Sequence, residues 1–163
     1  MVRRRKKRRL SIRQGAILWA ALGTTLATCV PPFVRELHAS PLHEVEETLP
    51  RLGELVLEFY GRTGTLPGSV ALTPATPARG TPRIDPPGTW DHPTWVVLGF
   101  RPGPDDAPHL FSFSFDNQGS SFVVEARGDL DGDGAQSRFA LRGTIDNGTA
   151  RLDEGMVVEN ELE

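Results

Sequence analysis

The residues whose spacing most directly suggests chemistry are three aspartates in the last third of the chain. Asp129, Asp131 and Asp133, with Gly132 and Gly134, have the D-x-D-x-D-G spacing that begins a calcium-binding loop. Alternating carboxylates on a tight turn can converge on one cation, and glycine permits the sharp reversal. The spacing predicts a structural calcium ion. The other interpretation is a hairpin turn whose carboxylates are solvated.

An EF-hand is excluded for this loop. The twelfth position of such a loop holds a bidentate glutamate, and here that position is Ala140. The sequence also predicts no helix on either side. Any calcium bound here would be held weakly, as suits an extracytoplasmic compartment.

No other group of residues has the spacing of an active site. The Gly-x-Ser-x-Gly nucleophile motif, the phosphate loop and H-E-x-x-H do not occur in the sequence. We therefore expect a protein that is not an enzyme and that has no small-molecule substrate. Surface or interfacial positions are expected for the four histidines: His38, His43, His92 and His109. Trp90 and Trp95 are expected to pack the proline-rich segment onto a sheet, although an exposed pair could bind a partner.

Charge is distributed very unevenly along the 163 residues. All 21 acidic residues lie after residue 35, whereas 8 of the 18 lysines and arginines lie in residues 3–13. The rest of the chain carries ten arginines against 21 acidic residues, a net charge of −11. Such a surface repels phosphate, which argues against a nucleic-acid partner, and the apolar run directly after the basic cluster argues against a nucleic-acid patch there. A single cysteine excludes an intrachain disulfide framework.

An uncharged run follows the basic segment directly. From Gly15 to Val34 there are 20 residues without a charge, and this run includes Trp19, Gly23 and Pro31. About 20 apolar residues span a membrane, and the positive-inside rule keeps a preceding basic cluster in the cytoplasm. The sequence predicts a cytoplasmic segment over residues 1–13 and a transmembrane signal-anchor over 14–34. A cleavable secretory signal has the same order and stays an alternative.

Cys29 adds another alternative for this segment. Leu26, Ala27, Thr28 and Cys29 resemble the lipobox before the acylated cysteine of bacterial lipoproteins, in which Gly, Ala or Ser usually precedes the cysteine. Lipidation at Cys29 is one interpretation. The other is a small apolar residue within a membrane helix.

The remainder predicts an α+β fold. An apolar stripe with spacings of three and four indicates an amphipathic helix over residues 35–63, which either starts near Pro41 or bends at Pro50. Residues 64–93 are rich in proline and predict an irregular loop. Over 94–163 we expect an antiparallel β-meander with the helix on one face. The expected strands are 95–100, 110–115, 122–126 and 138–145, with a tight turn at Asn147 and Gly148.

This order of segments resembles a type IV pilin or type II secretion pseudopilin. Residues Val30 to Phe33 fall where pilins have an isoleucine-proline-alanine-phenylalanine turn, which places Leu10 at the first mature position. Gly23 then matches the mid-helix glycine, and Gln14 matches the glutamate used in assembly. The distal segments FYGRTGTLPGSVALTP, TWVVLGF and ARGDLDGDGAQSRF are similar to pilin-like proteins of the myxobacterial type.

The resemblance implies a protein of the bacterial inner membrane with its C-terminal domain in the periplasm or outside. Its partners would be the membrane and other pilin-like subunits or platform proteins of a pilus or secretion apparatus. Similar pseudopilins bind calcium in a strand loop. Prepilin peptidase cuts after glycine, and Arg9 stands at that position. With Gln14 replacing the glutamate, the resemblance implies an uncleaved relative or accessory subunit. The alternative is a solitary membrane- or lipid-anchored binding domain that does not polymerise.

Overall fold

The apolar stripe that ends near residue 60 belongs to the long helix of the structure. The computed structural model describes residues 42–104 and 107–161, and residues 42–63 are helical throughout. Val45, Leu49, Leu52 and Val56 are fully buried, and their spacing of three and four puts them on one face. The amphipathic helix is thus confirmed over 42–63. It continues through Pro50 as helix.

Six antiparallel strands form one sheet, with the order β1-β2-β3-β4-β5 and with β6 also paired to β4. The strands are β1 (Val70–Thr73), β2 (Ser112–Asn117), β3 (Ser121–Gly128), β4 (Ser137–Asp146), β5 (Thr149–Leu152) and β6 (Val157–Glu159). Consecutive strands are neighbours from β1 to β5, so the predicted meander is confirmed. The strands expected at 110–115, 122–126 and 138–145 correspond to β2, β3 and β4.

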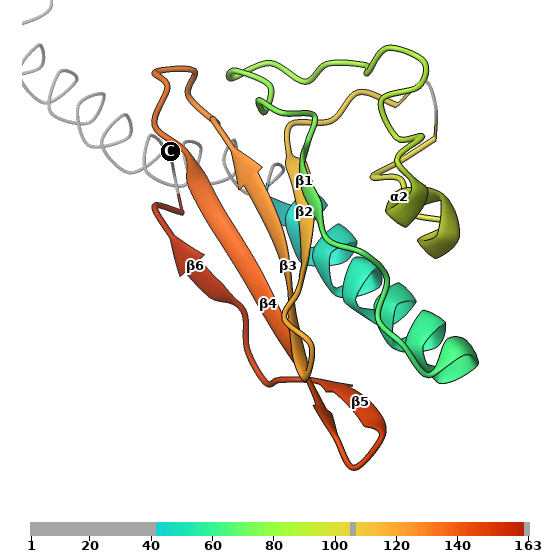
Figure 1. Cartoon of the computed structure of the whole chain (residues 1–163). Coiled ribbons are helices and arrows are strands. Elements are labelled where there is room, and N and C mark those ends of the chain that lie inside the picture. The colour runs from blue at the N-terminus through green and yellow to red at the C-terminus, as the bar shows by residue number, and fades with distance from the viewer. Residues whose placement is uncertain (1–41, 105–106, 162–163) are drawn as a thin grey trace, which may run out of the picture. The chain divides into compact units, whose positions relative to one another are not determined.

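One face of this sheet is covered by the long helix (Figure 1). Burial alternates along β3, where Phe122, Val124 and Ala126 are buried and the residues between them are partly exposed. The helix stripe belongs to the same hydrophobic core as these strand residues. At Gly53 the helix comes so close that an added Cβ would lie 2.9 Å from a methyl group of Leu152. The α+β class, with helix on sheet, is therefore what the structure has.

The prediction of a strand over residues 95–100 is wrong. Residues Pro93–Leu98 form the short helix α2 instead. The ring of His92 accepts a hydrogen bond from the backbone N–H of Thr94, and Pro93 occupies the first turn, where it loses no helical hydrogen bond. Gly99 ends the helix in the left-handed conformation at φ 63°. These local start and stop signals outweigh the β propensity of the apolar run.

The proline-rich segment, predicted as loop over 64–93, contains one strand that the sequence analysis missed. β1 pairs with β2, with Val70 opposite Phe115 and Thr73 opposite Phe113. It has only four residues and is followed by a proline, so its own sequence carries a weak strand signal. The predicted turn between β4 and β5 is confirmed, since Asn147 and Gly148 have φ values of 48° and 77°.

The basic segment 1–13 and the predicted anchor 14–34 lie outside the described residues. In the part of the chain that the structure does describe, no helix has both the length and the apolar character that a membrane crossing needs.

Candidate functional site

The first candidate site is the acidic loop found in the sequence. Residues 129–136 connect β3 to β4. Carboxylate oxygens of Asp129, Asp131 and Asp133 lie within 4.8 Å of one another. The sequence spacing thus does bring the three side chains together, as expected for a turn of this composition.

Arg79 already neutralises one carboxylate of this loop. Its Nε lies 3.5 Å from Oδ2 of Asp129, whose side chain is only 3% exposed. Next to it, the N–H of Gly80 donates to the backbone carbonyl of Asp129 at 2.7 Å. The proline-rich segment therefore lies against the acidic loop, and the largely exposed side chain of Arg79 forms an ion pair with its most buried member, Asp129.

The two exposed aspartates accept hydrogen bonds within the loop itself. The N–H of Asp133 donates to Oδ1 of Asp131 at 3.0 Å, and the N–H of Ala135 donates to Oδ1 of Asp133 at 2.7 Å. Gly132 and Gly134 adopt φ values of 85° and 100°, which only glycine adopts readily. This geometry suits a tight turn and also leaves carboxylate oxygens near one another. Calcium binding stays a prediction.

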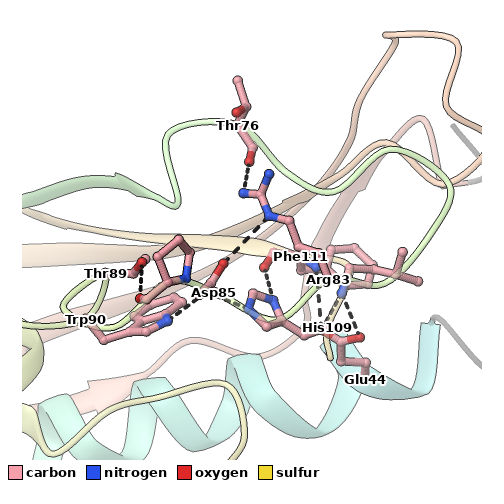
Figure 2. Close-up of polar contacts among 10 residues, drawn as sticks. Glu44, Thr76, Arg83, Asp85, Thr89, Trp90, His109 and Phe111 are labelled. Atoms are coloured by element: carbon pink, nitrogen blue, oxygen red, sulfur yellow. Dashed lines mark hydrogen bonds and ion pairs between the residues drawn. The ribbon is translucent and has the colours of Figure 1, made fainter. Parts of the chain in front are cut away.

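The second candidate is a buried polar group that no motif or spacing in the sequence indicates. We call it the Asp85–His109 cluster: Glu44, Asp85, Trp90 and His109 (Figure 2). Two backbone hydrogen bonds join Arg83 and His109: the N–H of each residue donates to the carbonyl of the other at 3.0 Å. They fix the proline-rich segment beside the residues that lead into β2, and so bring Asp85 to His109.

Hydrogen bonds occupy both ring nitrogens of His109. Nε2 lies 2.7 Å from Oδ2 of Asp85, and Nδ1 lies 2.8 Å from the carbonyl oxygen of Phe111. A carbonyl only accepts, so Nδ1 donates; an ionised carboxylate also accepts, so Nε2 donates as well. The ring form that satisfies both contacts is the imidazolium. Neither nitrogen is left to take a proton from a substrate, so this is not the geometry of a general base.

Trp90 and Arg83 complete the surroundings of Asp85. The indole N–H of Trp90 donates to Oδ2 at 2.8 Å. The other oxygen, Oδ1, is buried, has no hydrogen-bond partner among the described residues, and lies 3.7 Å from Nε of Arg83. In Figure 2, Arg83, Trp90 and His109 surround the Asp85 carboxylate.

Glu44 brings a second carboxylate to the cluster from the long helix. Its oxygens accept from the N–H of Leu110 at 3.2 and 3.3 Å and from that of Phe111 at 3.5 Å. Burial raises the pKa of Glu44, while these N–H groups and the charge of His109 act in the opposite direction. Desolvation is the largest of these effects.

A hollow of about 320 Å³ opens beside the cluster. Asp85, Trp90 and His109 line it together with residues 86–88 and 102–104. Its volume is at the lower end for a small-molecule pocket. Oδ2 of Asp85 and both ring nitrogens of His109, which line this hollow, are already engaged in hydrogen bonds within the chain.

The structure corrects one expectation about the histidines. His109 is buried, with 8% of its surface exposed, and is not a surface residue. His43 and His92 are exposed, as expected. Trp90 and Trp95 are buried in the core and pack against each other at a centroid distance of 5.7 Å, so their packing role is confirmed. The predicted membrane and assembly positions lie outside the described residues: Gln14, Gly15, Trp19, Gly23, Cys29 and Pro31.

No family model matches this sequence, and no curated protein or solved structure matches it either.

Proposed function

We propose that the chain is a non-enzymatic, membrane-anchored protein of the pilin-like or pseudopilin-like kind, a subunit or accessory of a type IV pilus or type II secretion apparatus. The observation that carries the proposal is the position of the long helix. Seven residues separate the uncharged run ending at Val34 from the described helix, whose apolar stripe is part of the domain core. A domain built this way would be attached to its anchor through an element of its own core.

The charge distribution supports the proposed orientation. The basic residues 3–13 favour a cytoplasmic N-terminus, and the acidic remainder would then lie beyond the inner membrane, in the periplasm or outside. The described elements are a long helix followed by an antiparallel sheet, with the short helix α2 between β1 and β2; a long helix before an antiparallel sheet agrees with what the pilin-like resemblance implies. The proposed partners are other pilin-like subunits or the platform proteins of such a machine.

The absence of a catalytic role is part of the proposal. In the described residues, the buried histidine–carboxylate pair has both ring nitrogens engaged. Asp129, the most buried acidic side chain of the loop, is paired with Arg79. These contacts give both groups a structural explanation.

A solitary anchored domain is the second candidate, and two sequence positions favour it. Arg9 stands where prepilin peptidase needs glycine, and Gln14 stands where pilins have the assembly glutamate. Glutamine can accept a hydrogen bond but cannot neutralise the amine of a neighbouring subunit in the membrane. A protein of this kind would keep the fold without polymerising.

Intact mass of the membrane-extracted chain tests the anchor. Retention of all 163 residues in a carbonate-washed membrane fraction is the expected result. Recovery in the soluble fraction would contradict anchoring, and a mass beginning at Cys29 with acyl chains would make the protein a lipoprotein. The matched variant Arg9→Gly, expressed with a prepilin peptidase, should lose residues 1–9 if the N-terminal segment is otherwise pilin-like.

Co-purification in mild detergent separates the two candidates. A subunit or accessory should bring pilin-like or platform proteins with it, in amounts close to its own. Purification of the wild-type chain alone, under conditions that keep a known assembly of the same cells intact, would support the solitary domain.

A further inference from the structure

The Asp85–His109 cluster joins three segments that are distant in the sequence. Glu44 comes from the long helix, Asp85 and Trp90 from the proline-rich segment, and His109 from the residues before β2 (Figure 2). The side chains of Asp85 and His109 are 6% and 9% exposed. Contacts made there therefore hold the proline-rich segment on the domain with little competition from water.

A neutral His109 ring cannot satisfy this geometry while Asp85 is ionised. If Nε2 loses its hydrogen, its lone pair faces the Asp85 carboxylate at 2.7 Å. If Nδ1 loses its hydrogen, its lone pair faces the Phe111 carbonyl at 2.8 Å. Either tautomer leaves two acceptors in contact at a buried position, which is costly. Oδ2 of Asp85 also accepts the indole N–H of Trp90, a hydrogen bond that an ionised carboxylate forms more strongly than a neutral carboxyl group.

We propose that the doubly protonated His109 is a pH-responsive latch that holds residues 83–90 on the domain, and that loss of one of its protons loosens this segment. The inference does not depend on the proposed function. It rests on the two acceptors that face the ring and on the burial of both partners.

The charged groups around the ring set the direction of the response. Glu44 faces it from the helix, and Asp85 faces it from the proline-rich segment with Arg83 behind. Asp91 and Arg101 line the hollow beside it. Without the imidazolium charge, Glu44 and Asp85 would be two buried carboxylates with Arg83 as the nearest cation on the Asp85 side. The latch is therefore closed while the His109 ring carries both hydrogens, and it opens when rising pH removes one of them.

Nitrogen-15 NMR of the full-length chain in mild detergent tests this directly, with a titration from about pH 4 to about pH 9. Both ring nitrogens of His109 should report attached hydrogens at the acidic end. As the ring loses a proton, hydrogen exchange of the Arg83 amide and the Trp90 indole, corrected for intrinsic pH dependence, should rise roughly tenfold or more. The Val124 amide, in the centre of the sheet, should not change.

Two variants separate the latch from other titrations. His109→Gln should abolish the pH dependence of exchange in residues 83–90. His43→Gln removes an exposed histidine of the long helix and should leave that dependence as in the wild type. A wild-type ring that is neutral throughout the titration would overturn the proposal, and so would constant protection of Arg83 and Trp90 while His109 deprotonates. Both outcomes are measured on the wild type, so the test stands even if His109→Gln does not fold.

Discussion

Nε2 of His109 lies 2.7 Å from Oδ2 of Asp85, although the two residues are 24 positions apart in the chain. The indole N–H of Trp90 donates to the same oxygen. Complete ion pairs inside a protein contribute little net stability, whereas a buried charge that loses its partner is strongly destabilising. The relationship thus makes Asp85 a position where a single substitution should have a large effect.

Asp85→Ala should lower the free energy of unfolding by about 3–5 kcal/mol, because it leaves His109 and the Trp90 indole without their acceptor. Urea unfolding of the full-length chain followed by tryptophan fluorescence measures this change. The matched variant Asp91→Ala removes an exposed carboxylate that lies 4.0 Å from Arg101. It should change stability by less than about 1 kcal/mol. Equal effects of the two substitutions would contradict the role assigned to Asp85.

Glu44 predicts a specific pH dependence of stability. Burial raises the pKa of this carboxyl above its ordinary value of 4.5, so the folded state binds the proton more tightly than the unfolded state. Its contribution to stability is therefore fully present below pH 4.5 and is lost as pH rises through the raised pKa. The wild type should lose stability relative to Glu44→Gln across this range, which unfolding curves at several pH values would show.

The control for this prediction is Glu54→Gln, at an exposed position of the same helix. Its difference in stability from the wild type should be the same at each pH. The stability difference between the wild type and Glu44→Gln could instead be the same at every pH, or change with pH in the opposite direction. Either result would show that the hydrogen bonds from Leu110 and Phe111 outweigh desolvation.

Two fully buried serines differ in their hydrogen bonding. Within the described part of the chain, Oγ of Ser112 has no hydrogen-bond partner, whereas Oγ of Ser137 donates to the carbonyl of Gly128 at 3.2 Å. Ser112→Ala removes an unsatisfied hydroxyl and should be neutral or stabilising. Ser137→Ala should cost about 1 kcal/mol. Thermal unfolding of the two variants side by side checks the difference, and a larger loss for Ser112→Ala would reveal a partner that the described residues do not provide.

Gly143 lies against the ring of Phe122, its partner across β3 and β4. An added Cβ would lie 2.2 Å from the ring, so Gly143→Ala should destabilise the domain by about 1–3 kcal/mol or more. Gly61, in the long helix, has nothing within 4 Å of such an atom. Gly61→Ala should stabilise by about 0.5–1 kcal/mol through helix propensity. Chemical unfolding of both variants gives the comparison, and a stable Gly143→Ala would contradict the packing.

Calcium is tested by its effect on thermal stability. If the acidic loop binds it, millimolar calcium should raise the unfolding temperature by a few degrees (about 1 kcal/mol), and a chelator should reverse the shift. The double variant Asp131→Asn with Asp133→Asn should not respond. Magnesium at equal concentration is the control for ionic strength. An equal response to both ions, or none, would favour the solvated turn.

Features that depend on a few neighbouring residues were predictable. The spacing of Val45, Leu49, Leu52 and Val56 indicated the helix face, because a helix repeats every 3.6 residues whatever surrounds it. Alternation indicated β2 in the same way. Local patterns also explain the failure at 95–100, where capping by His92 and Gly99 decided for helix over a run with β propensity.

The acidic loop could be predicted from the sequence, whereas the Asp85–His109 cluster could not. Asp129, Asp131 and Asp133 converge because they share one turn, so their spacing alone was sufficient. Asp85 and His109 meet because β1 joins the sheet and the following segment pairs with the residues before β2; Glu44 joins them because the helix covers that sheet. Which buried donor meets which acceptor depends on the segments that the fold brings together. Periodicity and turn preferences depend on neighbouring residues, whereas hydrogen-bond partners that are distant in the sequence are determined only by the tertiary structure.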